Sequence, residues 1–251
     1  MPRTTTPEEH ELAEKRSELE ELQGLLGDRE LYLATLRAEL SHFEGLYLRT
    51  VGARYAELDE LKARIAEHLA ERHSGQSLYR EQAAQTRARA RESAGAASAA
   101  SPPTKPFAPS SELKSLYRQL AKHIHPDLAT DEEDRARRDR LMKEANQAYG
   151  AGDEARLRRI LNEWQASPDA VAGEGVGADL VRVIRKIDQV RRRLADIERE
   201  IQELKDGELF SLKTKVDAAT QQRRDLLKEM IASVDLQVAA AQSRLAALGL
   251  E

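Results

Sequence analysis

The sequence predicts an all-α protein in which two long coiled-coil helical arms flank a small helical domain. Of its 251 residues, 33% are charged, 40% are hydrophobic and only 4% are aromatic, which suits long solvated helices better than one large core. Apolar residues recur at heptad spacing in both halves of the chain, and a shorter stripe of helical period lies between them. We expect the two arms to form an antiparallel stalk.

The first arm is a coiled coil over residues 8–92. Its seam has a leucine at every seventh position and further apolar residues between them: Leu12, Leu19, Leu26, Leu33 and Leu40, with Leu22, Leu36 and Phe43. After Tyr47 the seam continues four residues out of step, at Val51, Leu58 and Ile65. Such an offset is a stutter, which locally unwinds a supercoil. It predicts a bend or a local break, with a continuous helix as the alternative.

Two linkers separate the arms from the central segment. Residues 93–109 form an Ala/Ser/Pro-rich linker that holds half of the eight prolines, and we expect it to be extended. Residues 166–178 form a shorter, Gly-rich linker.

The second arm is a coiled coil over residues 179–249. Both seam positions are filled in its first heptads, at Leu180/Val183, Ile187/Val190, Leu194/Ile197 and Ile201/Leu204. Asp206-Gly207 interrupts the pattern before a last register from Leu227 to Leu248. If the arms pair within one chain they must lie antiparallel, and if they pair between chains the protein is an elongated homo-oligomer. Periodicity does not separate these two arrangements.

The central domain, residues 110–165, begins with an amphipathic helix that runs into His125-Pro126-Asp127. Its apolar stripe follows a 3.6-residue period: Leu113, Leu116, Tyr117, Leu120, Ala121 and Ile124. A basic row, Lys114, Arg118 and Lys122, recurs every four residues and therefore shares one face. Pro126 stops the helix, so His125 and Asp127 are expected on a loop.

Two further helices are predicted in the central domain. Residues 130–133, Thr-Asp-Glu-Glu, form a capping box, and the helix that follows carries Leu141, Ala145, Ala148 and Tyr149 as its stripe. The short connection makes this helix antiparallel to the first. Asp153 caps a third helix, whose apolar residues are Leu157, Ile160, Leu161 and Trp164.

These residues resemble a known family. The run from Tyr117 through Arg118, Leu120, Ala121 and Lys122 to His125-Pro126-Asp127, followed by Leu141-Met-Lys-Glu-Ala-Asn-Gln-Ala-Tyr149, resembles the J domain of DnaJ-type co-chaperones. The resemblance covers residues 110–165, under a quarter of the chain. The family's usual short first helix is replaced here by Pro102 to Pro109, with Phe107 as the residue expected to pack in its place, and Gln119 stands at an often basic position.

The resemblance implies a co-chaperone that binds a DnaK-type chaperone and stimulates its ATP hydrolysis. Its partner-binding residues would be the signature His125, Pro126 and Asp127 and, on the preceding helix, Lys114, Tyr117, Arg118 and Lys122. A row of cations steers a protein toward an acidic partner surface, which is compatible with this role. The arms would set the location or the client, and the catalysis would belong to the partner.

Other chemistry is disfavoured by the sequence. His123 and His125 lack further ligands for a metal, and His125 with Asp127 has no nucleophile beside it, so no catalytic residue, metal or cofactor is expected and the chain is not expected to be an enzyme. The arginine clusters alternate with acids and lack stacking aromatics, which disfavours nucleic acid. No cysteine, signal core or membrane-spanning stretch is present, and we expect a cytoplasmic protein. The competing function is a scaffolding coiled-coil protein with a degenerate J-like domain.

Overall fold

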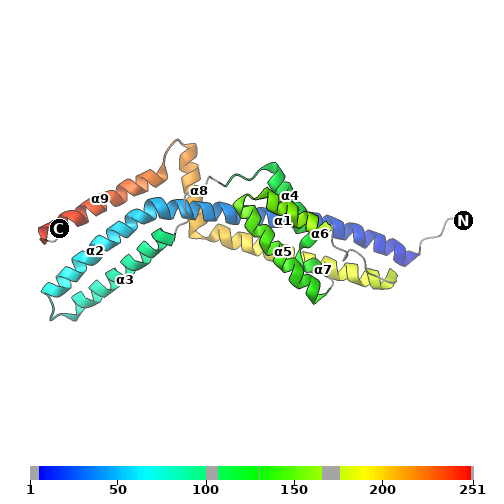
Figure 1. The fold of residues 1–251 in the computed structure, drawn as a ribbon, viewed down its shortest axis with the longest axis horizontal. Coiled ribbons are helices and arrows are strands. Elements are labelled where there is room, and N and C mark those ends of the chain that lie inside the picture. The colour runs from blue at the N-terminus through cyan, green and yellow to red at the C-terminus, as the bar shows by residue number, and fades with distance from the viewer. Residues whose placement is uncertain (1–5, 100–106, 130, 166–175, 250–251) are drawn as a thin grey trace. The chain divides into compact units, whose positions relative to one another are not determined.

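The computed structural model describes residues 6–99, 107–129, 131–165 and 176–249, and every element in these ranges is a helix (Figure 1). The all-α prediction is confirmed. The chain divides into two compact units, one made of Met1–Glu39 with Phe107–Asp206 and the other of Leu40–Pro106 with Gly207–Glu251. Each predicted arm is therefore shared between both units, which the sequence did not indicate.

The first arm is helical from Pro7 to Arg72. It consists of α1 (Pro7–Tyr47), the π-helical turn η1 (Leu48–Gly52) and α2 (Ala53–Arg72). The π-helical turn lies where the heptad seam is out of step. A π turn adds a residue to the turn and so shifts the side-chain register without ending the helix. The continuous-helix alternative is confirmed, and Val51 is buried at that turn.

In the second unit, α2 and α3 (Ser77–Ala99) form a hairpin, and α9 (Leu226–Ala247) packs against α2. α8 (Glu208–Gln221) precedes α9 after the predicted interruption at Gly207. The core contains Leu58, Leu61, Ile65, Val234, Val238 and Leu245. Residues 93–99 belong to α3, so the prediction of a linker from residue 93 is wrong there, and residues 100–106 lie outside the described ranges.

In the first unit, α1 pairs with α7 (Val176–Asp206) through the predicted seams, as Leu12 packs with Val183 and Ile187. Arg16 bonds Asp179, and Arg37 bonds Glu200. Both contacts join residues 163 positions apart, so the two helices run in the same direction.

The predicted antiparallel pairing is thus wrong. Figure 1 shows α7 running alongside α1 and α9 alongside α2, each in the direction of its partner. The prediction assumed that the first arm runs one way until it meets the central domain, but the α2–α3 hairpin reverses the chain before that point. Residues 176–178, predicted as linker, begin α7, and residues 166–175 lie outside the described ranges.

The central domain contains α4 (Ser111–Ile124), the 3-10 turn η2 (Pro126–Leu128), α5 (Glu132–Ala151) and α6 (Glu154–Gln165). The Ser110 hydroxyl caps α4 by accepting the Leu113 N–H at 2.9 Å. Asp131 caps α5, and Thr130, the first residue of the predicted capping box, lies outside the described residues. Gly152 ends α5 with φ of 71°, a left-handed conformation that glycine adopts without strain. Asp153 caps α6 as predicted.

The core of the central domain is completed by α1. Tyr117 and Tyr149 meet at its centre with ring centroids 4.7 Å apart, and Phe107 packs edge-on against Tyr149 at 5.6 Å, as expected. Leu31 of α1 is buried in the same cluster, and Thr35 shares a 2.8 Å hydrogen bond with the Tyr149 hydroxyl. Phe107 and α1 together cover the core where the resemblance implies a short first helix.

Replacing Leu31 with alanine should lower the free energy of unfolding of this unit by about 2–5 kcal/mol, because the change leaves a cavity in the shared core. The matched control is Leu25→Ala on the same helix, where the leucine is 44% exposed and the change should stay within about 0.5 kcal/mol. Urea unfolding followed by the fluorescence of Trp164, the sole tryptophan, measures both. Equal midpoints would show that α1 is not part of this core.

Candidate partner-docking site

The His125-Pro126-Asp127 tripeptide forms a single 3-10 turn at the end of α4 rather than the loop predicted. The His125 carbonyl accepts the Leu128 N–H at 3.0 Å, and His125 Nδ1 accepts the Asp127 N–H at 3.2 Å. The second bond places the ring proton on Nε2. The Asp127 carboxylate lies 3.7 Å from His125 Nδ1, and its side chain is 25% exposed. The turn therefore has a fixed backbone and one partly accessible carboxylate.

Arg138 of α5 stabilises the turn by bonding the backbone that immediately precedes it. Its guanidinium donates to the His123 carbonyl at 2.8 Å and to Asp134 at 2.8 Å, and it lies 4.6 Å from the Trp164 ring centroid. The Arg138 side chain is only 12% exposed, so it is a structural residue of the domain and not part of a solvated helix face. No signal in the sequence separates Arg138 from its neighbours, since only the fold brings the carbonyl of His123 within its reach.

His125 is buried, with 4% of its surface exposed. Its Nε2 donates a 2.9 Å hydrogen bond to the carboxylate of Glu30, which lies on α1 and is itself 5% exposed. Arg193 of α7 donates to the same carboxylate at 2.8 Å. Glu30 thus joins the signature turn to both helices of the α1–α7 pair, and sequence analysis missed both Glu30 and Arg193.

The pKa of Glu30 lies below its ordinary value. Burial acts in the opposite direction, because it disfavours the charged carboxylate. The hydrogen bond from His125 and the charge of Arg193 outweigh that cost and leave the pKa lowered. The carboxylate is therefore ionised at neutral pH, and the buried contact is a charge-assisted one.

The basic row on α4 also faces α1. Arg118 forms an ion pair with Asp28, and Lys122 lies 3.7 Å from Glu20, whereas Lys114 is exposed. Between these pairs the backbones approach closely at Gly27. A Cβ atom at this position would lie 2.9 Å from the carbonyl oxygen of Arg118, closer than real side chains pack. We use the term docking face for Lys114, Arg118, Lys122 and the His125–Asp127 turn.

The docking face is partly covered in this structure. α1 occupies the centre of the face, and α7 packs against η2. Tyr117 is fully buried, and its hydroxyl donates to Asn146. Burial raises the pKa of Tyr117 well above its ordinary value, so the hydroxyl stays protonated. Tyr117 is a core residue here and not the accessible partner contact that was predicted.

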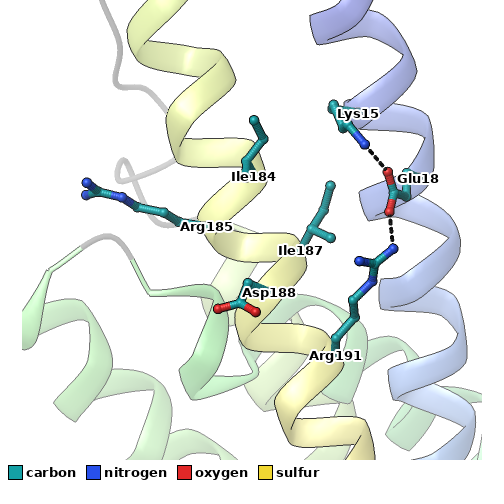
Figure 2. A pocket seen from close by; sticks show the side chains of 7 residues that line it. All are labelled: Lys15, Glu18, Ile184, Arg185, Ile187, Asp188 and Arg191. Atoms are coloured by element: carbon teal, nitrogen blue, oxygen red, sulfur yellow. Dashed lines mark hydrogen bonds and ion pairs between the residues drawn. The ribbon is translucent and has the colours of Figure 1, made fainter.

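A recess lies between α1 and α7 (Figure 2). Ile184 and Ile187 line it, and Glu18 accepts from Lys15 at 2.8 Å and from Arg191 at 2.6 Å. Arg185 points away from the recess, and Ile187 belongs to the core of the α1–α7 pair, so the recess is part of the coiled-coil seam. Across the described ranges, no group of three or more metal-binding side chains comes together.

Comparison with known proteins does not place the chain in a family. No protein-family model matches it, and neither a curated protein nor a solved structure was found to be similar. In the part of the chain that the structure describes, no helix has the length and apolarity to cross a bilayer. The resemblance of residues 110–165 to the J domain stands on the motif residues alone.

Acidification should weaken the contact at Glu30. A carboxylate whose native pKa is depressed adds stability above its ordinary value of 4.5, and that contribution is lost as the pH falls through the lower native pKa. Glu30→Gln should therefore be less stable than the parent above pH 4.5, and the difference should shrink at lower pH. The groups that face Glu30 are His125, Arg193 and Tyr117.

Urea midpoints from Trp164 fluorescence, measured across the acid range, test this expectation. Glu21→Gln, at an exposed carboxyl of the same helix, is the control and should follow the parent at every pH. A difference between parent and Glu30→Gln that stays constant with pH would contradict it.

Proposed function

We propose that this chain is a J-domain co-chaperone that binds a DnaK-type chaperone and stimulates its ATP hydrolysis. The observation that carries the proposal is the juxtaposition at the tip of the α4–α5 pair. There the His125-Pro126-Asp127 turn, braced by Arg138, lies at the end of a helix whose cations Arg118 and Lys122 share one face. A rigid carboxylate beside a cationic row suits recognition of a charged partner surface.

The cover formed by α1 is consistent with this function if the covered form is a resting state. α1 contributes carboxylates to the cations and to His125, so the charges of the docking face are compensated while no partner is bound. A partner would have to replace these contacts. The α1–α7 pair is the part of the chain that would decide where the co-chaperone acts.

A scaffolding role is the second candidate, and one observation favours it. Leu31 is buried in the core of the central domain, and Glu30 is buried against His125, so the domain also acts as a packing element for α1. In a scaffold this packing would be the whole purpose of the domain. The two candidates differ in whether Asp127, which contributes nothing to that core, matters for activity.

Asp127→Asn should abolish stimulation of the ATPase of a DnaK-type chaperone, because the amide keeps the shape of the side chain but removes its charge. The measurement is single-turnover ATP hydrolysis at increasing concentrations of the full chain. Asp139→Asn, at an exposed carboxyl on α5, is the charge-matched control and should stimulate as the parent does.

Helix content and the Trp164 midpoint should be the same for both variants and the parent, so that a loss of stimulation is not a loss of fold. A parent and an Asp127→Asn variant that stimulate equally would exclude the co-chaperone proposal. Absence of stimulation by every form, including forms in which α1 is released, would favour the scaffold.

A further inference from the structure

We infer that α1 is an intramolecular competitor for the docking face, and that the structure is an autoinhibited state opened by separating α1 from α4. The inference rests on the proposed function and adds the regulation of the same site. Three independent features of the α1–α4 contact support it. They are matched charges, a close backbone approach at a glycine, and a buried carboxylate whose hydrogen bonds link the contact to α7.

α1 presents acidic side chains to the docking face, as an acidic partner would. Glu20, Asp28 and Glu30 place their carboxylates against Lys122, Arg118 and His125. Three of the predicted docking residues are thus engaged by one helix of the same chain. Because two ligands cannot make the same contacts, a partner can replace Glu20, Asp28 and Glu30 only in molecules where α1 has moved away.

The close approach at Gly27 shows that the contact is shaped for α4. Hydrogen in place of a side chain lets the Arg118 carbonyl and the Lys122 side chain lie against the α1 backbone. Gly24, one turn earlier on the same helix, has no atom within 4 Å of a Cβ. Both positions are helical and glycine disfavours helix at each, but only at Gly27 does the packing require it.

The third feature is the buried carboxylate of Glu30. It accepts from His125 in the turn and from Arg193, which also donates to Glu200 at 2.7 Å on its own helix. Moving α1 alone away from the domain would leave His125 without this acceptor and would separate Glu30 from Arg193, whereas moving α1 together with α7 would break only the contact with His125. Opening therefore involves the α1–α7 pair as well as α4, and anything that binds that pair and displaces Arg193 would favour the open form.

The docking face is only partly covered, since half of the Arg118 side chain is exposed beside its ion pair with Asp28, and the charges of two other docking residues are not engaged by α1. Lys114 is exposed, and the Asp127 side chain is partly exposed at the edge of the contact. A partner can therefore meet these two charges before α1 leaves. The charged groups of Arg118 and Lys122, which pair with Asp28 and Glu20, and the buried ring of His125 become free only after release, so the parent chain should show weak rather than absent stimulation.

The test is a pair of glycine substitutions in the full chain. Gly27→Ala forces a methyl group against the Arg118 carbonyl and should open the contact, whereas Gly24→Ala makes the same change where there is space. We expect Gly27→Ala to lower the concentration for half-maximal stimulation of a DnaK-type ATPase about tenfold, the order expected when a packed contact is overfilled. Gly24→Ala should match the parent, and Asp127→Asn added to Gly27→Ala should remove the stimulation.

Opening is measured separately by hydrogen exchange. The peptide that covers residues 125–129 should exchange faster in Gly27→Ala than in Gly24→Ala. If Trp164 fluorescence shows that Gly27→Ala does not fold, Asp28→Lys replaces it. This change repels Arg118 at an exposed position, and Glu21→Lys, on the same helix, is its control.

The outcomes separate the two proposals. Faster exchange with no gain in stimulation, in a parent whose activity depends on Asp127, overturns the autoinhibition and leaves the co-chaperone function standing. Unchanged exchange in both Gly27→Ala and Asp28→Lys also overturns it, because α1 would then not be releasable. If the turn opens and no form stimulates, the proposed function fails, and the inference fails with it.

Discussion

The structure of the first unit depends on one buried carboxylate. Glu30 is removed from water and yet ionised, because His125 and Arg193 both donate to it. A buried charge without partners is costly, so the three groups must stay together or all be solvated. The position of the signature turn is thus set by a contact between three segments that are far apart in sequence.

α1 packs against α7 with one face and against the central domain with another. Leu12, Leu19 and Leu22 of α1 pack against α7, while Gly27, Asp28 and Leu31 face the central domain. A heptad seam uses only part of a helix surface, which leaves the rest available for a second contact. This double use explains why the central domain and α7 fall in one compact unit with most of α1, up to Glu39.

For the proposed function, α1 and the partner chaperone would compete for the docking face. Exposed ion pairs such as Lys122 with Glu20 contribute little each, whereas the buried contacts of Leu31 and Glu30 are costly to break. The strength of the cover is therefore concentrated in α1 near residues 27–31. A co-chaperone built in this way would be governed by what happens to its arms, and a scaffold would use the same contacts permanently.

The sequence determined the helices, the cap at Asp153, the register shift after Tyr47 and the core stripes, because periodicity and capping are local properties. It also brought His125 and Asp127 together at one turn. Only the tertiary structure decided that the arms run parallel and that α1 covers α4. Those outcomes depend on tertiary contacts, namely which helix packs against α4 and which acidic side chains then pair with Arg118 and His125. The residues that are neighbours in the sequence do not determine such contacts.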